Sequence, residues 1–113
     1  MLITINNFQI QAEVAQSIFA HAIGLMGRKH LAERHGMLFV FRRDVREVFW
    51  TFGMRFSIDI IFIDASKTIT EIREDCRPWR SVIYPKKKFR YAIEVAAGSA
   101  RRMNVHVGDA ADF

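Results

Sequence analysis

Two carboxylates lie inside apolar stretches of this sequence, at places where an ordinary core needs none. Asp59 shares one face of a predicted strand with Ile61 and Ile63, and Glu94 stands between small alanines at the alternating positions beside it. A buried, ionised carboxylate must be paired or hydrogen-bonded, because an isolated charge costs several kcal/mol. Two carboxyl groups in different environments are also what general acid–base catalysis uses. An acid–base enzyme is therefore one hypothesis, and it requires Asp59 and Glu94 to face the same concavity.

Asp59 has two arginines as expected partners, Arg28 and Arg55. A buried Asp–Arg pair would fasten the glycine-bounded turn at 24–28 to the sheet, which is a purely structural role. The alternative is that Asp59 is a residue of a functional site. The residues around Glu94 are small, which suits either a surface position or the floor of a groove.

Aromatic and methionine residues indicate a ligand groove. Trp50 lies in an apolar run, and Trp79 lies on a loop bracketed by Pro78 and Pro85. Together with Met26 they could line a cleft, because aromatic rings and methionines suit adaptable recognition of apolar ligands. Plain core packing is the alternative for Trp50, whereas Trp79 has little core to enter and should be partly exposed. The predicted ligand-binding residues are Met26, Arg28, Trp50, Asp59, Trp79 and Glu94.

A basic stretch between 77 and 91 supports a different hypothesis. Its cations alternate with aromatic residues, and this combination is what single-stranded nucleic acid needs from a protein. A solvated loop explains a run of three lysines equally well, and no known nucleic-acid motif is present. The predicted nucleic-acid-binding residues are Arg77, Arg80, Lys86, Lys87, Lys88 and Arg90.

The sequence contains few of the patterns that are typical of metal or cofactor sites. The four histidines form no i, i+4 pair and there is one cysteine, Cys76, so the usual metal-ligand spacings are missing. No serine sits in a nucleophile elbow, and the acidic neighbours of Cys76 would raise its pKa. The glycine spacing at 24–28 is wrong for a phosphate-binding loop. We therefore expect neither a metal nor a cofactor, and no serine or cysteine hydrolase.

The elements that must position these residues are strands. Runs at 37–41, 47–52 and 58–63 are apolar on both faces and should be central, whereas 67–74 is more polar, like an edge strand. Asn6-Asn7 is a plausible hairpin turn between strands near 3–5 and 8–12. Helical spacing from Val14 to Ile23 predicts a helix ending at Gly24, and Ser99 is a candidate N-cap for a second one. A strand at 89–95 and a last one ending at 113 complete an all-β fold, a sandwich or flattened barrel of about eight short strands.

Length and composition agree with one folded domain over residues 1–113. Half of the residues are hydrophobic and ten are phenylalanines, which excludes a disordered tail. The longest apolar run is far shorter than the roughly 20 residues that span a bilayer, and the first residues lack the basic lead of a signal peptide. We expect a cytoplasmic protein with no membrane contact. The net charge of +5 fits either a polyanion partner or simple solubility.

Several short motifs follow one another along the chain in a specific order. They are GLMGR at 24–28, GMLFVF at 36–41, FW at 49–50, IDIIFID at 58–64, Pro85, YAIE at 91–94, Gly98 and VGD at 107–109. On these residues the chain resembles domain of unknown function family 192, small β-rich proteins of bacteria and archaea. The resemblance implies a compact β-sandwich and no established activity. Where that family usually has Met-Lys-Asn-Thr, this chain has TFGM at 51–54, so no role of those polar groups carries over.

The leading functional hypothesis is a non-enzymatic accessory domain that binds a small ligand or a protein partner. Its groove would lie near Trp50 and Trp79, with Arg28, Asp59 and Glu94 supplying polarity. The alternatives are a nucleic-acid-associated protein using residues 77–91 and an acid–base enzyme using Asp59 and Glu94. The identity of the ligand and the oligomeric state are not encoded in any pattern that we find.

Overall fold

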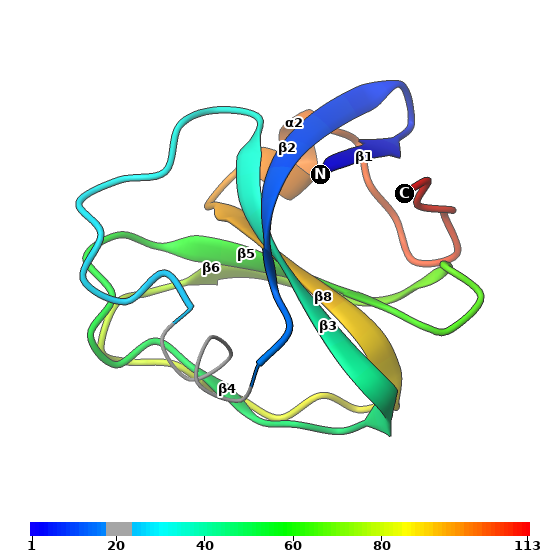
Figure 1. The fold of residues 1–113 in the computed structure, drawn as a ribbon. Helices are drawn as coiled ribbons and strands as arrows, with labels where there is room; N and C mark the ends of the chain where they lie inside the picture. Colours follow the sequence, from blue (N-terminus) through cyan, green and yellow to red (C-terminus); the bar gives the residue numbers. More distant parts are fainter. Residues whose placement is uncertain (18–23) are drawn as a thin grey trace.

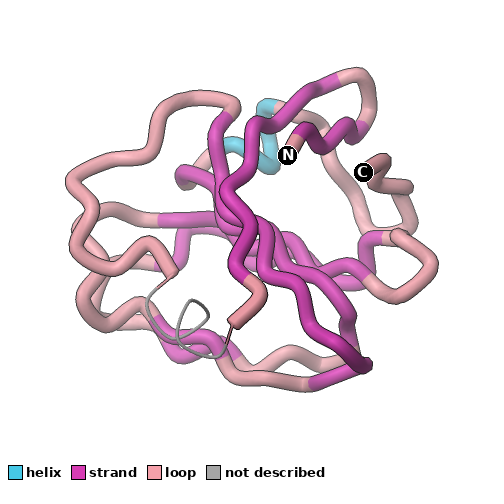
Figure 2. Tube along the Cα trace, viewed as in Figure 1, coloured by secondary structure: helices cyan, strands magenta, loops and turns pink. Residues whose placement is uncertain are grey.

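Strands are the main regular structure of the fold. A computed structural model describes residues 1–17 and 24–113, and within them eight strands form two sheets. The larger sheet has the order β1-β2-β3-β8-β5-β6, and the smaller one pairs β4 with β7. The strands are β1 (Leu2–Ile5), β2 (Phe8–Ala15), β3 (His35–Val45), β4 (Phe49–Trp50), β5 (Ile58–Ile63), β6 (Ile69–Cys76), β7 (Val82–Ile83) and β8 (Phe89–Ala96). This confirms the all-β prediction, and Figure 2 shows how little of the described chain is helical.

The larger sheet is mixed and strongly twisted. β2 and β3 pair in parallel, whereas the other neighbours are antiparallel. Figure 1 shows that β2 and β3 cross β5 and β6 at a steep angle, as accumulated strand twist produces. The predicted Asn6-Asn7 turn joins β1 to β2, and both asparagines have positive φ, 50° and 68°. The central positions of β3, β8 and β5 in the sheet explain their apolar composition on both faces.

Alternate rows of side chains from the sheet enter two separate cores. Leu38, Ile93 and Ile61 lie opposite one another on β3, β8 and β5, and all three belong to one apolar cluster. The next row belongs to the other cluster, because successive side chains on a strand point to opposite faces. It consists of Phe39, Ala92 and Phe62. We name the clusters the Leu38 core and the Phe39 core after their β3 residues.

The Leu38 core is enclosed by the C-terminal segment. Thr4 in β1 exchanges backbone hydrogen bonds of 2.9 Å with Asp112, and Thr68 before β6 forms a bridge with Ala110. The same segment therefore contacts both edges of the larger sheet, and the two chain ends lie close together in Figure 1. On this side the sheet approaches a flattened barrel, with Ile3, Ile5 and Met103 buried inside.

The Phe39 core is covered by the small β4-β7 sheet and its loops. The Phe49 ring of β4 makes edge contacts with Phe39 and Phe62, at centroid distances of 5.4 and 5.5 Å. It also lies 6.0 Å from the Phe89 ring. This cover is small, since β4 and β7 contain two residues each. The β4-β7 sheet by itself therefore covers only part of the Phe39 side of the larger sheet.

Several predicted elements differ in detail. The predicted helix began at Val14, but Val14 belongs to β2, and the Ile18–Ile23 part of it lies outside the described residues. The 47–52 run forms the short β4 and is not a central strand of the larger sheet, whereas the 67–74 strand is confirmed as an edge, shifted to Ile69–Cys76. The last strand is reduced to isolated bridges. The short helix α2 (Ser99–Arg102) has Gly98, not Ser99, as its N-cap.

Candidate functional site

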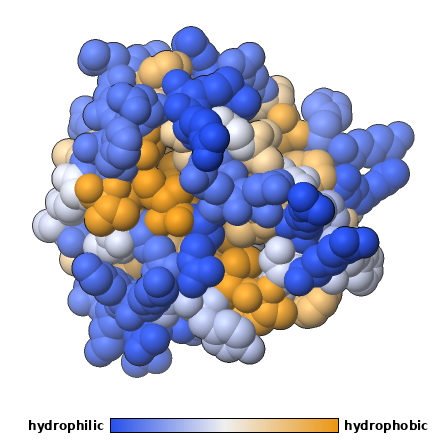
Figure 3. Space-filling model, turned by 180° about the vertical axis from the view of Figure 1, so that it is seen from behind, coloured by the Kyte–Doolittle hydropathy of each residue, from blue (hydrophilic) through white to orange (hydrophobic). Residues whose placement is uncertain are grey.

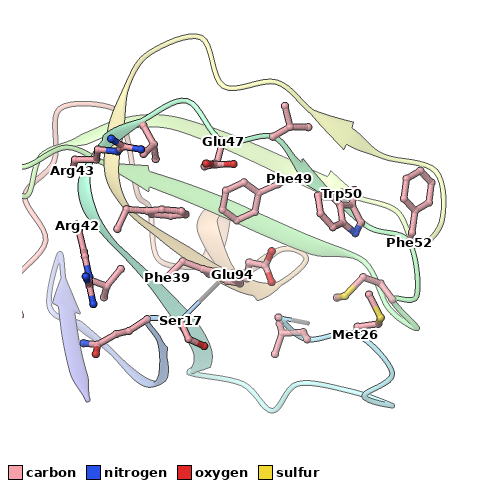
Figure 4. Close-up of a pocket in the computed structure, with 18 residues that line it drawn as sticks. Ser17, Met26, Phe39, Arg42, Arg43, Glu47, Phe49, Trp50, Phe52 and Glu94 are labelled. Atoms are coloured by element: carbon pink, nitrogen blue, oxygen red, sulfur yellow. The ribbon is translucent and has the colours of Figure 1, made fainter. Parts of the chain in front are cut away.

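A cavity of about 670 Å³ opens on the Phe39 side of the sheet. It lies between β3, the residues around β4 and the turn at 24–26, with one contribution from β8 (Figure 4). Its volume lies within the range of about 300–1,000 Å³ that small-molecule sites occupy. The lining residues are Gln16, Ser17, Gly24, Leu25, Met26, Phe39, Val40, Phe41, Arg42, Arg43, Val45, Glu47, Val48, Phe49, Trp50, Phe52, Met54 and Glu94.

Glu94 is the buried acid of this cavity. In the sheet it lies opposite Met37 of β3 and Ile60 of β5, both members of the Phe39 core, so its side chain enters the same side. Only 5% of the residue is exposed, and no residue in the ranges 1–17 and 24–113 makes a hydrogen bond or ion pair with its carboxyl group. Burial therefore raises the pKa of Glu94 from 4.5 to about 8. The cavity contains a carboxyl group that is mostly protonated at neutral pH.

The turn at 24–27 leaves room for this carboxyl group. Gly24 has φ +49°, and a Cβ built on it would lie 3.2 Å from Phe39 Cζ and 3.6 Å from Glu94 Oε1. A side chain at this position would therefore press on the cavity wall. Leu25 is buried in the Phe39 core, while Met26 beside it is exposed at the cavity rim.

Apolar side chains form the wall and the rim. Phe39, Phe49 and Met54 are buried at the base, whereas Met26, Trp50 and Phe52 are 41–46% exposed around the opening. Large apolar side chains are costly to leave in water, so a cluster of them beside a cavity is a signal of binding. Figure 3 shows apolar residues gathered in patches on an otherwise hydrophilic face.

Three charged residues, Arg42, Arg43 and Glu47, also line the cavity. Arg42 and Arg43 belong to the end of β3, where its pairing with β8 shifts between Val40 and Val45. Sequence reasoning missed all three as site residues, because Arg42 and Arg43 lie in an RRD run that is typical of a solvated turn and Glu47 is an ordinary charged residue just after it. The only signal was the place of these residues soon after the buried run at 36–41.

Asp59 has a different environment. It lies opposite Val95 of the Leu38 core, so it is on the other side of the sheet from Glu94. Its carboxylate accepts three backbone N–H groups, from Asp75 at 2.9 Å and from Gly98 and Ala100 at 3.0 Å each. The pairing of β5 with β6 is irregular at this point, and the carboxylate accepts an amide beside the irregularity. Asp59 thereby fastens the end of β6 to the start of α2.

The predicted Asp59–arginine pair is therefore wrong. Arg28 instead forms an exposed ion pair with Glu13 on β2, whose pKa is lowered by that hydrogen bond, and Arg55 is exposed. Backbone amides are closer to Asp59 in the fold than any cation. The acid–base hypothesis also fails its geometric condition, because Asp59 and Glu94 face opposite sides of the sheet.

Trp79 is exposed, as expected, but it does not line the cavity. Trp79 is 64% exposed, and its backbone N–H donates to the carbonyl oxygen of Thr51 over 2.9 Å. The Thr51 hydroxyl donates to the carbonyl of Arg77 and accepts the N–H of Ser81, which holds the loop in place. Of the six predicted ligand-binding residues, the cavity brings together Met26, Trp50 and Glu94, and it excludes Arg28, Asp59 and Trp79.

The basic stretch is only partly available for binding. Exposed cations are found at Arg77, Arg80, Lys86, Lys87 and Lys88. Arg77 pairs with Asp75 at 3.6 Å and Arg90 pairs with Asp44 at 3.0 Å. Of the aromatic residues between them, Trp79 and Tyr84 are exposed. Phe89 is fully buried, and Tyr91 packs edge-on against Phe113. Phe89 belongs to the Phe39 core and Tyr91 packs against the Leu38 core, and the register of β8 with β3 shifts between these two residues.

Other chemistry finds no site in the described part of the chain. No group of three or more metal-ligating side chains occurs among residues 1–17 and 24–113, and His21 lies outside them. Cys76 is buried, and burial together with the charge of Asp59 raises the pKa of its thiol to about 11. Within the same residues, no helix has the length and apolarity needed to cross a bilayer.

Comparison with known proteins identifies relatives over the whole chain. The family model DUF192, described as "Uncharacterized ACR, COG1430", matches residues 1–113. A UPF0127 protein of Pyrococcus abyssi (strain GE5 / Orsay) is 32% identical over 105 residues, which cover 91% of this chain and 86% of that protein. A UPF0127 protein of Pyrococcus furiosus is 30% identical over 103 residues, covering 89% and 84%.

Two crystal structures are similar to this fold. One, from Sinorhizobium meliloti 1021, is described as a candidate transcription regulator. It is 30% identical with a TM-score of 0.88, covering 92% of this chain and 81% of that one. The other is a protein of unknown function from Novosphingobium aromaticivorans DSM 12444, with 22% identity and a TM-score of 0.94, covering 100% and 84%. The second similarity concerns the fold alone.

Proposed function

We propose that the chain, which belongs to the DUF192 family of uncharacterised proteins, is a binding module for a small and largely apolar ligand. The ligand would occupy the cavity between β3, β4 and the turn at 24–26. The observation that carries the proposal is Glu94, a buried carboxyl group at the cavity with no partner among the described residues. A carboxyl group in the wall of an apolar cavity is the kind of polar group that orients a small ligand by hydrogen bonding.

The protonated state of Glu94 determines what that ligand group would be. With a pKa of about 8, the carboxyl group keeps its proton at neutral pH and offers one O–H donor and a carbonyl acceptor. A hydroxyl or carbonyl group on the ligand would satisfy it. The apolar part of the ligand would replace water on Phe49, Trp50 and Met26, and each Å² of apolar surface so buried contributes roughly 25 cal/mol.

The chain provides its own reporter for a test. It has two tryptophans, so Trp79→Phe leaves Trp50 at the cavity rim as the sole indole. In this variant we expect 1-decanol, a neutral apolar probe with one hydroxyl, to change Trp50 emission in a saturable way. Val48→Arg places a charge on the rim, where the residue is 36% exposed, and should weaken decanol binding by about tenfold.

Val107→Arg is the matched control, because Val107 is 59% exposed and does not line the cavity. It should leave the decanol affinity unchanged. Emission that does not saturate, or equal affinities in Val48→Arg and Val107→Arg, would overturn the proposal.

A second candidate function is association with single-stranded nucleic acid. It is favoured by the exposed cations Arg77, Arg80 and Lys86–Lys88 near the exposed rings of Trp79 and Tyr84, and one similar structure is described as a candidate transcription regulator. Binding of a labelled oligouridine should weaken steeply with salt, and replacing the three lysines by alanine should reduce it further. Binding that ignores salt, or no binding at low salt, would exclude this candidate.

A further inference from the structure

We infer that the ligand of the cavity is an amphipathic anion, with an apolar body and an acidic head held by Arg42 and Arg43. This inference rests on the proposed function and adds the chemical class of the ligand. Its basis is the distribution of charge and apolar surface along the cavity.

The charged and apolar parts lie at different ends. In Figure 4, Arg42 and Arg43 are at one end and Phe52 and Met26 are at the other, with Phe49 and Glu94 between them. A ligand that fills the cavity must therefore place an apolar part against the rings and a polar part against the arginines. A uniformly apolar molecule would leave the arginine end unmatched, and a uniformly polar one would leave the rings in water.

The two arginines are available for a ligand. Neither makes an ion pair with any residue in 1–17 or 24–113. The adjacent acid, Asp44, is engaged by Arg90 at 3.0 Å and so offers them little neutralisation. Arginine side chains bind carboxylate and phosphate groups through paired N–H donors, which makes an anionic head the matching chemistry.

The acids of the cavity do not cancel this preference. Glu47 is the one acid besides Glu94 among the described lining residues, against two arginines. Glu94 keeps its proton at neutral pH. It would therefore form hydrogen bonds with the ligand and would not repel an anionic head group. The cavity is thus net positive at its polar end, which disfavours a cationic head on the same apolar body.

Three probes with the same ten-carbon body separate the alternatives. Decanoate, 1-decanol and decyltrimethylammonium carry a negative, a neutral and a positive head, and each is titrated below its micelle concentration against the Trp79→Phe protein. We expect decanoate to bind about tenfold more tightly than decyltrimethylammonium, with decanol between them. Calorimetry on the unmodified protein provides an independent measurement.

The variant Arg42→Ala/Arg43→Ala tests the assignment of the head. It should reduce decanoate affinity about tenfold and change decanol affinity less than twofold. Lys87→Ala/Lys88→Ala is the matched control, since it removes the same charge from an exposed loop that does not line the cavity. It should leave decanoate affinity within twofold of the original. If long-range charge attraction alone held the head group, both double variants would lose the same affinity.

The outcomes are distinguishable. Equal binding of the three probes, or equal losses in the two double variants, would overturn the anion assignment while leaving the binding function intact. Tighter binding of decyltrimethylammonium would also overturn it. If none of the three probes binds, the proposed function itself fails together with this inference.

Discussion

Two buried acids on neighbouring strands, Asp59 of β5 and Glu94 of β8, have opposite surroundings. The exposed fractions are 0% and 5%, so burial does not distinguish them. Asp59 receives three backbone N–H groups on the Leu38 side of the sheet, and its charge is satisfied by the fold itself. Glu94, on the Phe39 side, lies at a cavity and has no partner among the described residues.

The two acids differ in what surrounds them: Asp59 has a structural role, and Glu94 lies at the cavity to which we assign the proposed ligand. The three amides that bind Asp59 come together only when the end of β6 and the start of α2 are correctly placed. The hydrogen bonds of Asp59 therefore stabilise this arrangement. A carboxyl group without a partner contributes nothing comparable to stability, because its burial is a net cost. Three measurements test this difference between Asp59 and Glu94.

Removal of the Asp59 carboxylate should have the largest effect. Asp59→Ala leaves three amide N–H groups without their acceptor, two at the start of α2 and one at Asp75, and each charge-assisted bond contributes about 1.5–3 kcal/mol. We expect the free energy of unfolding, measured by urea denaturation, to fall by about 3–5 kcal/mol. Asp64→Ala is the control, because Asp64 accepts the N–H groups of Ser66 and Thr68 in an exposed turn. Equal losses in the two variants would contradict a special role for Asp59.

The pH dependence of stability should show the effect of the raised pKa of Glu94. In the folded protein its carboxyl pKa is about 8, whereas in the unfolded chain it returns to near 4.5. Between these values the folded state retains a proton that the unfolded state has released, so stability falls as pH rises. The loss begins near pH 4.5 and is complete above about pH 8. It amounts to a few kcal/mol, since each pKa unit corresponds to about 1.4 kcal/mol.

Urea midpoints measured between about pH 5.5 and pH 9 would show this decline, and Glu94→Gln should remove it. Other shifted groups act outside this window. Glu13, Asp64 and Asp109 have lowered pKa values, so their contributions are lost only as the solution becomes acidic. The thiol of Cys76, with a pKa raised from 9.0 to about 11, acts at higher pH. A slope that persists in Glu94→Gln would mean that another group is responsible.

Two glycines test the space beside Glu94. Gly24 and Gly27 both have positive φ, +49° and +80°, so alanine at either position has a conformational cost of roughly 1 kcal/mol. The Cβ of Gly24→Ala would also meet Phe39 at 3.2 Å, whereas nothing lies within 4 Å of the one in Gly27→Ala. We expect Gly24→Ala to be the less stable by up to about 1 kcal/mol and to bind decanol more weakly. Identical stability and affinity in the two variants would show that the turn does not shape the cavity.

Much of the fold could be predicted because strand patterns are local. The alternation in 89–95 and the apolar runs at 37–41 and 58–63 identify β8, β3 and β5, and Asn6-Asn7 identifies the first hairpin. The prediction was wrong where local preference competed with tertiary contacts. Val14 fits a helical period, but it extends β2, which pairs in parallel with β3. Ser99 is a good N-cap by type, but the Asp59 carboxylate from β5 supplies the acceptor for the amides at that helix start.

The candidate site was less predictable than the fold. Glu94 and Trp50 could be selected because their types are unusual in their surroundings. Arg42, Arg43 and Glu47 could not, since charged residues after a strand look the same whether they face water or a cavity. Trp79 showed the converse: the sequence correctly predicted its exposure, but not that the Thr51 hydrogen bonds hold its loop away from the cavity.

Sequence alone is enough to predict that the chain forms β-structure, that Asp59 lies in a strand of apolar residues, and that the chain resembles its family. These properties follow from residue type and period along a strand. The burial of Glu94, the opposite sides on which the two acids lie and the partners of Asp59 become known only from the folded structure. The partners of Asp59 are backbone amides, and every residue except proline carries one. A pattern of side chains along the sequence therefore cannot predict which amides will bind the carboxylate.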